Sequence, residues 1–349
     1  MKNDISSRKK LLWTVLFAVI AAATVWAVAS HSKAFSAASF ASYISGASKV
    51  WLIAAILSML GFVVFEGEAV TSICRAFGCF PNHKQGFIYS ASDIYFSAIT
   101  PSASGGQPAC AYFMIKDGIP ASVTTLVLLV NLAMYTLSIL IINLMAVIFQ
   151  PRVFMSFGLL SKALIIIGFI IQGLLAVFFL MLLMKCDLLH KICRRALHLL
   201  CRLRLLKHEE EKQLKLDNYI SEYAAYSEMI KEQKRAMLSA FLFNMLQRIS
   251  ILSVPLFVFL ATGGEFAKAA EILAVQSYVV IGSNAVPIPG AMGVSDYIML
   301  DGYGNMMPYQ SAVNFELLSR SLSFYVCVIL CGAAVFIKYL IQKRAEKKK

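Results

Sequence analysis

Three long stretches of the sequence contain no charged residue, and they constrain the fold more than any other feature. They run from Leu11 to Ala29, from Gly118 to Pro151 and from Ala163 to Met184. A helix of about 20 apolar residues matches the hydrocarbon thickness of a bilayer. The composition, 59% hydrophobic and 15% charged, departs from that of soluble domains in the same direction. The sequence therefore predicts a polytopic membrane protein and excludes an ordinary soluble enzyme.

The membrane-spanning segments are expected to be helices, because backbone groups that face lipid must be hydrogen-bonded within their own segment. The alternating ten-residue segments of an outer-membrane barrel are missing from the sequence. The predicted fold class is an all-α polytopic membrane protein with about six full transmembrane helices. Their expected positions are 11–29, 50–70, 118–151, 163–184, 236–261 and 312–337.

Lysine and arginine indicate the orientation through the positive-inside rule. Basic residues precede the first apolar run, twelve Lys and Arg lie in 185–235, and a basic tail begins at Lys338. Placing all three segments in the cytoplasm orients every span and puts both termini there. The first run resembles a secretory signal, but its 19 residues exceed the apolar core of such signals. This length favours an uncleaved anchor.

Two further apolar segments, 87–100 and 272–285, are too short to cross. Each holds about 14 residues, which reach roughly 21 Å as a helix against a core of about 30 Å. Each is followed by a break rich in proline and glycine and then by a second short apolar arm. We interpret them as re-entrant helical hairpins at 87–117 and 270–303 that enter from opposite faces. This pattern is typical of an inverted repeat with a binding site near the midplane.

The expected organisation is a single transmembrane domain over residues 1–349. Its first half covers about 1–184 and its second half about 236–340, joined by a basic amphipathic cytoplasmic segment, 185–235. A net charge of +13 would suggest nucleic acid in a soluble protein. Here topology accounts for it, and basic juxtamembrane helices are typical of contact with anionic lipid. Membrane phospholipids are therefore expected as partners and nucleic acid is not.

Ionisable side chains inside the apolar segments are candidate binding residues, because burying an isolated charge in a membrane is costly. They are Asp93, Arg248, Asp296, Glu316 and Arg320. Guanidinium groups bind phosphate in a bidentate manner and stay charged, so the arginines are the expected phosphate ligands. Asp93 and Asp296, one in each hairpin, would balance charge or meet an amine. Glu316 and Arg320, four residues apart, equally fit a structural ion pair.

The two breaks carry a second set of candidates. Proline removes a backbone donor, glycine permits close backbone approach, and helix N-termini attract anions, here expected from Ala109 and Val294 onward. The alternative is that these residues only kink two buried helices. The remaining candidate binding residues are Thr100, Pro101, Gly105, Gly106, Gln107, Pro108, Gln247, Asn284, Pro287, Pro289, Gly290 and Gly293. Glu66 and Glu68 are assigned to the membrane interface.

Several familiar chemistries find no support in the sequence. It contains no Walker A motif and no dinucleotide-binding glycine motif, and its eight cysteines form no CxxC pair. The five histidines are not spaced as metal ligands. Neither a cofactor nor a metal is expected, and no catalytic residue is assigned.

The runs from Ser90 to Pro108 and from Val286 to Gly293 resemble the lysylphosphatidylglycerol synthase transmembrane family. This is the flippase-like membrane domain of the multiple peptide resistance factor, and the likeness extends from Leu11 to Tyr339. The resemblance implies a bacterial inner-membrane protein, linked to antibiotic resistance, that moves lipids such as aminoacylated phosphatidylglycerol to the outer leaflet. Asp296 stands where many members of the family have Glu. The Pro and Gly positions of the family correspond here to Pro101, Gly105, Gly106, Pro108, Pro287, Pro289, Gly290 and Gly293.

Full-length synthases of the family add a soluble domain that transfers lysine from lysyl-tRNA to the lipid. This chain ends eleven residues after Lys338, so we expect no such domain and favour a lipid translocase. Two alternatives stay open: a phosphatidylglycerol lysyltransferase, as the family name implies, and a membrane partner of a separate synthase that docks on 185–235. The sequence also leaves open whether the chain forms a homo-oligomer.

Overall fold

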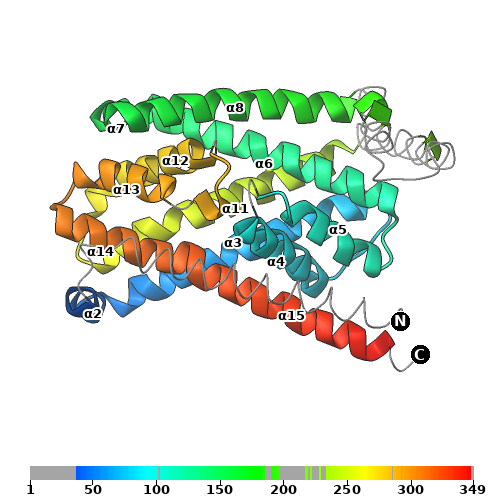
Figure 1. Ribbon diagram of the computed structural model, residues 1–349, viewed down its shortest axis with the longest axis horizontal. Coiled ribbons are helices and arrows are strands. Elements are labelled where there is room, and N and C mark those ends of the chain that lie inside the picture. Colours follow the sequence, from blue (N-terminus) through cyan, green and yellow to red (C-terminus); the bar gives the residue numbers. More distant parts are fainter. Residues whose placement is uncertain are drawn as a thin grey trace, which may run out of the picture. The chain divides into compact units, whose positions relative to one another are not determined.

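A computed structural model describes residues 37–100, 103–184, 190–192, 194–195, 217–218, 221, 228, 233–284, 286–291 and 293–346. The chain divides into two units, Met1–Ala47 and Ser48–Lys349. In the first unit the described element is α2 (Ala37–Ser45). All regular elements in the described residues are helical (Figure 1), so the predicted all-α polytopic class is confirmed.

The second unit contains two series of helices. The first series is α3 (Lys49–Ala76), α4 (His83–Ile99), α5 (Gly106–Lys116), α6 (Ala121–Phe149), α7 (Pro151–Ser156) and α8 (Leu159–Met184). The second series is α11 (Lys234–Ala261), η2 (Phe266–Lys268), α12 (Ala269–Asn284), η3 (Pro289–Ala291), α13 (Val294–Gly304), α14 (Tyr309–Arg320), η4 (Ser321–Val326) and α15 (Cys327–Glu346).

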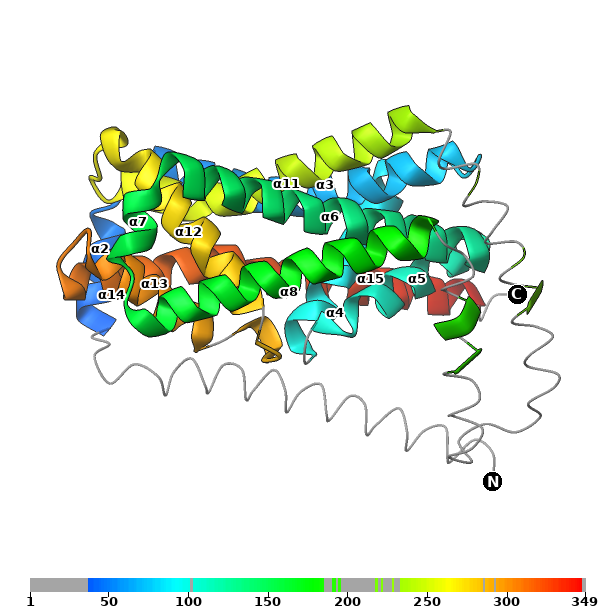
Figure 2. The same ribbon diagram turned by 90° about the horizontal axis from the view of Figure 1, so that it is seen from above.

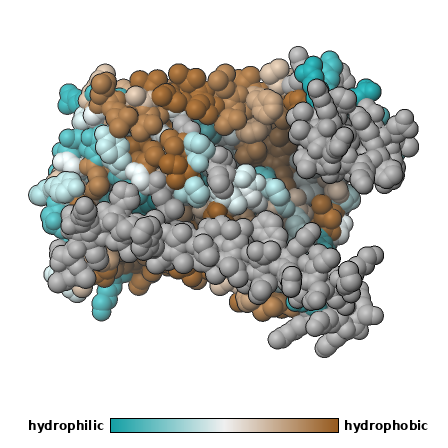
Figure 3. Space-filling model, viewed as in Figure 1, coloured by the Kyte–Doolittle hydropathy of each residue, from teal (hydrophilic) through white to brown (hydrophobic). Residues whose placement is uncertain are grey.

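Five helical segments of the described residues are long and apolar enough to cross a membrane: α3, α6, α8, α11 and the continuous run Tyr309–Lys343. They coincide with five of the six predicted spans, and the sixth, 11–29, lies outside the described residues. Along α8 large apolar side chains face outward; Leu159 is 88% exposed and Leu174 66%. Figure 3 shows this hydrophobic surface over α8. Lipid is the solvent that suits such a surface.

Helices α4 and α5 form an antiparallel hairpin. At its base, Gln85 Nε2 and Tyr89 Oη donate to Asp117 Oδ2 at 3.1 and 3.0 Å. Near its tip, Gln107 Nε2 donates to Asp93 Oδ2 at 2.7 Å. Contacts at both ends require the two arms to lie side by side and the chain to reverse between them.

Helices α12 and α13 form a second antiparallel hairpin. At its base, Tyr303 Oη donates to Gln276 Oε1 at 3.2 Å. Further along, Gly282 faces the Ile298 side chain so closely that an added Cβ would lie 2.9 Å from Ile298 Cδ1. Both helix–break–helix patterns of the sequence are thus hairpins in the fold.

The two series meet along α3 and α11, which make the most extensive helix–helix contact of the described residues. Helix α4 of the first hairpin packs against α15 and against η3, the break of the second hairpin. Figures 1 and 2 show α4 beside α15, with α6 and α8 covering another side. This packing brings the broken part of one hairpin onto the other hairpin.

Helix boundaries differ from expectation at three places. Helix α4 begins at His83, four residues before Phe87, because Asn82 and Gln85 form a capping box with two bonds of 2.9 Å. Helix α5 begins at Gly106, three residues before Ala109, and Pro108 fits its first turn because no backbone donor is needed there. The last span is interrupted by the π-helical segment η4, directly after Arg320.

Close packing of α8 on α12 gives a stability prediction. A Cβ on Gly168 would overlap the Ile281 carbonyl and lie 2.7 Å from its carbon, whereas Gly173 on the same helix has nothing within 4 Å. We expect Gly168→Ala to lower the free energy of unfolding by about 1–3 kcal/mol, since the backbones must separate. Gly173→Ala should leave it unchanged or slightly raised. Thermal unfolding of both variants in detergent checks this, and equal melting temperatures would contradict it.

Candidate functional site

A polar cluster lies where the first hairpin meets α3 and α11. We call it the Glu66 cluster, and its members are Glu66, Ser90, Asp93, Ser97, Gln107, Gln247 and Arg248. Glu66 Oε2 accepts from Gln247 Nε2 at 2.9 Å and from Ser90 Oγ at 3.3 Å. Asp93 accepts from Gln107 at 2.7 Å and from Ser97 at 3.1 Å. The predicted residues Asp93, Gln107, Gln247 and Arg248 are therefore brought together.

Arg248 is the cation of this cluster. Its guanidinium lies over the ring of Tyr135, and the Cζ atom is 4.1 Å from the centroid of that ring. The same atom is 5.4 Å from the centroid of the Phe62 ring. It attracts both Glu66 and Asp93 electrostatically. Within the described residues its hydrogen bond is from Nε to Gln247 Oε1, at 3.3 Å. The terminal nitrogens keep donors for a ligand, and the stacking holds the group in place.

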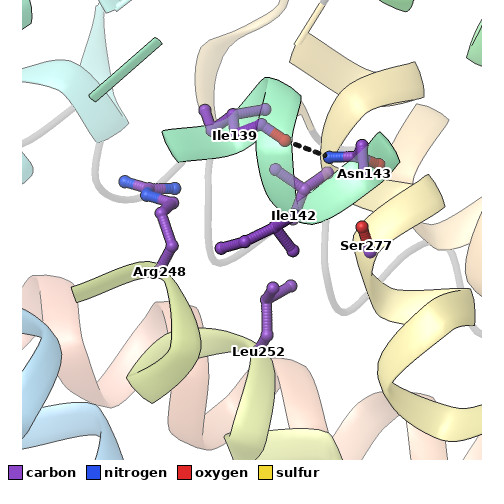
Figure 4. A pocket seen from close by; sticks show the side chains of 7 residues that line it. Ile139, Ile142, Asn143, Arg248, Leu252 and Ser277 are labelled. Carbon is purple, nitrogen blue, oxygen red and sulfur yellow. Dashed lines mark hydrogen bonds between the residues drawn. The ribbon is translucent and has the colours of Figure 1, made fainter. Parts of the chain in front are cut away.

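A small cavity adjoins Arg248 between α6, α11 and α12. Its volume is about 10 Å³. The residues that line it are Ile139, Ile142, Asn143, Arg248, Leu252, Ser277 and Val280. Figure 4 shows Arg248 reaching toward the α6 turn, with Asn143 and Ser277 on the far side of Ile142. Asn143 Oδ1 and Ser277 Oγ are buried without a hydrogen-bond partner. The space suits a single water molecule between two polar groups.

A second polar cluster joins α13 to α14. We call it the Arg320 cluster, and it consists of Asp296, Glu316 and Arg320. Arg320 Nε lies 2.9 Å from Asp296 Oδ1, and the Glu316 carboxyl interacts with both of the other groups. The ion pair of Arg320 therefore crosses between helices, where the sequence had equally fitted a pair with Glu316 along one helix. Arg320 Nη2 is buried and makes no hydrogen bond with the described residues.

The break residues have several environments. Thr100 Oγ1 accepts from Gly105 N–H at 2.9 Å, and a Cβ on Gly106 would overlap Asp93, so this break closes onto the Glu66 cluster. Gly293 N–H donates to Asp296 Oδ2 at 2.9 Å, so a carboxylate of the chain itself occupies the start of α13. Gly290, with φ 60°, faces the Phe324 ring.

Other predicted residues do not join a cluster in the described structure. Pro108, Asn284 and Pro287 are exposed, and Pro289 is part of η3. Pro101 lies outside the described residues. The predicted site is thus concentrated in two charged clusters with the hairpin tip around Gly106.

Comparison with known families supplies the remaining evidence. The family described as "Lysylphosphatidylglycerol synthase TM region" matches residues 12–331. The chain belongs to the lysylphosphatidylglycerol synthase transmembrane family. Comparison with curated proteins finds no match. Both polar clusters and both hairpins of this family member lie inside the matched range, so the membership concerns the part of the chain that carries the candidate site.

One central residue of this family member was misplaced by sequence reasoning. Glu66 had been assigned to the interface, yet it is 6% exposed and lies within the cluster that bears its name. Its place near the end of the expected span 50–70 hid this, because α3 continues beyond that span to Ala76 and Glu66 packs against neighbouring helices. A signal was available: Glu66 and Glu68 are two apart, so they point in different directions on a helix.

Proposed function

We propose that this protein moves an anionic or aminoacylated phospholipid between the leaflets of a bacterial inner membrane, with both termini in the cytoplasm. The observation that carries the proposal is the pair of buried arginines, Arg248 and Arg320, each beside a broken helical hairpin and each with terminal donors available to a phosphate. A phosphate headgroup would bind these guanidinium groups while its acyl chains stay in the surrounding lipid.

The arrangement of the helices supports this proposal. Each series contains a long helix, a hairpin and another long helix: α3, α4–α5 and α6 in the first, and α11, α12–α13 and α14–α15 in the second. We interpret the series as an inverted repeat and the hairpins as re-entrant. Such repeats expose a midplane site alternately to each side by movement of one half against the other. A polar headgroup then crosses without meeting hydrocarbon.

A transport assay tests the proposal directly. The purified chain is reconstituted in liposomes with fluorescent lysylphosphatidylglycerol or fluorescent phosphatidylglycerol in the inner leaflet, and a membrane-impermeant quencher reports the lipid that reaches the outer leaflet. We expect movement at least about tenfold faster than in empty vesicles, since the bare bilayer opposes burial of a charged headgroup. Rates equal to those of empty vesicles, across several anionic lipids, would refute the proposal.

The printed family name favours a second candidate, transfer of lysine to phosphatidylglycerol. It is tested by incubating the purified chain with phosphatidylglycerol and radiolabelled lysyl-tRNA. Label in the lipid fraction would establish the transferase. Lipid movement without labelling would leave the translocase as the activity of this polypeptide.

A further inference from the structure

Each polar cluster contains more acidic than basic groups. In the Glu66 cluster two carboxyls, Glu66 and Asp93, face one guanidinium, Arg248. In the Arg320 cluster the carboxyls of Asp296 and Glu316 again face one guanidinium. Full ionisation would leave one uncompensated negative charge in each, and an unpaired buried charge is costly.

The hydrogen bonds of the Glu66 cluster indicate where a neutralising proton resides. Three of the four carboxyl oxygens already accept from protein donors: Glu66 Oε2, Asp93 Oδ1 and Asp93 Oδ2. Glu66 Oε1 has no such donor among the described residues. The two carboxyl groups also interact directly, and two ionised carboxylates would repel each other. A proton on Glu66 Oε1, the carboxyl oxygen without such a donor in the described part of the chain, satisfies both observations.

Among the groups that act most strongly on Glu66 and Asp93, Arg248 is the cation. The other titratable groups that interact with the two carboxyls include the thiols of Cys110 on α5 and Cys331 on α15. On α6, the ring of Tyr135 lies beneath Arg248. With one bound proton the cluster is neutral, and Arg248 is balanced by Asp93.

We propose that the Glu66 cluster is a proton-binding site and that binding of a lipid phosphate at Arg248 draws a proton onto Asp93. The inference rests on the proposed function, because it takes the phosphate ligand from there. The phosphate neutralises the charge of Arg248, so Asp93 loses the positive charge that attracts it and takes up a proton from water. Linkage requires the reverse as well: release of the lipid releases the proton. A pH difference across the membrane would then drive the lipid.

Proton uptake on lipid binding tests this inference without requiring transport. Dioctanoyl phosphatidylglycerol is titrated into the purified protein at pH 7 by calorimetry, in two buffers of different ionisation enthalpy. The difference between the two heats gives the protons taken up per bound lipid. We expect about one proton for this singly anionic headgroup. Binding of dioctanoyl lysylphosphatidylglycerol should be accompanied by the uptake of fewer protons, because the ammonium groups of this lipid supply the counter-charge that Asp93 requires.

Variants assign the proton to the two carboxyls. Glu66→Gln combined with Asp93→Asn reproduces the doubly protonated state that we assign to the lipid complex, so it keeps the shape and hydrogen-bonding groups of the site. We expect it to bind phosphatidylglycerol with a proton uptake reduced at least about fivefold. Either single variant keeps uptake, because one carboxyl still lies in the field of Arg248 and can take up a proton. Glu265→Gln, at an exposed position outside the cluster, is the matched control and should keep the wild-type value.

The outcomes separate the two proposals. Binding of phosphatidylglycerol with no proton uptake by the wild-type protein overturns the proton site, whatever the transport assay gives. Undiminished uptake by the double variant overturns the assignment to Glu66 and Asp93. Uptake of about one proton together with no lipid movement in liposomes supports the proton site and refutes the translocase.

Discussion

Replacing Arg248 with lysine is expected to slow lipid movement at least about tenfold, although the positive charge is kept. The guanidinium stacks on Tyr135 at 4.1 Å and still has terminal donors for a phosphate. An ammonium offers neither the planar stack nor the bidentate geometry. The measurement is the liposome assay with fluorescent phosphatidylglycerol, normalised to the amount of folded protein.

Arg248→Gln separates charge from shape at the same position. It removes the positive charge that attracts Glu66 and Asp93, and leaving buried charge without compensation costs about 3–5 kcal/mol. We therefore expect a large loss of thermal stability for Arg248→Gln and a smaller one for Arg248→Lys. Arg75→Lys is the matched control, since Arg75 is 42% exposed in a 3.8 Å ion pair with Glu68 and should change neither quantity. Wild-type transport by Arg248→Lys would show that the guanidinium shape is not needed.

Adding one methyl group at Gly106 is expected to abolish lipid movement. A Cβ there would overlap the Asp93 carboxylate and the Ser97 hydroxyl, and would lie 2.7 Å from the Asp93 backbone oxygen. Because the obstruction includes backbone, α5 must move away from α4, and the bond from Gln107 to Asp93 is lost with it. We expect a destabilisation of about 1–3 kcal/mol.

The control for this substitution is Gly304→Ala, at the end of α13, where nothing lies within 4 Å of an added Cβ. It should behave as wild type in both the thermal unfolding and the liposome assays. If Gly106→Ala transports lipid at the wild-type rate, close contact between the hairpin tip and Asp93 is not part of the binding site.

Most members of the two candidate clusters could be identified residue by residue, because charge in an apolar segment is visible in the sequence. Asp93, Arg248, Asp296, Glu316 and Arg320 were all identified in this way, and all five lie in the two clusters. Their partners were harder to predict. That Arg320 pairs with Asp296 depends on the packing of α13 against α14, which no spacing along the chain encodes.

The sequence by itself determined the class of fold and the positions of the described spans, because hydrocarbon excludes charge and unpaired backbone over a fixed thickness. Local chemistry also determined where helices break, at the Pro- and Gly-rich runs after Thr100 and before Gly293. Only the tertiary structure decided that Glu66 belongs to the centre of the first cluster and that η3 packs on α4. Those contacts join residues far apart in the chain, so side-chain packing between helices sets them, and the pattern along any single helix does not.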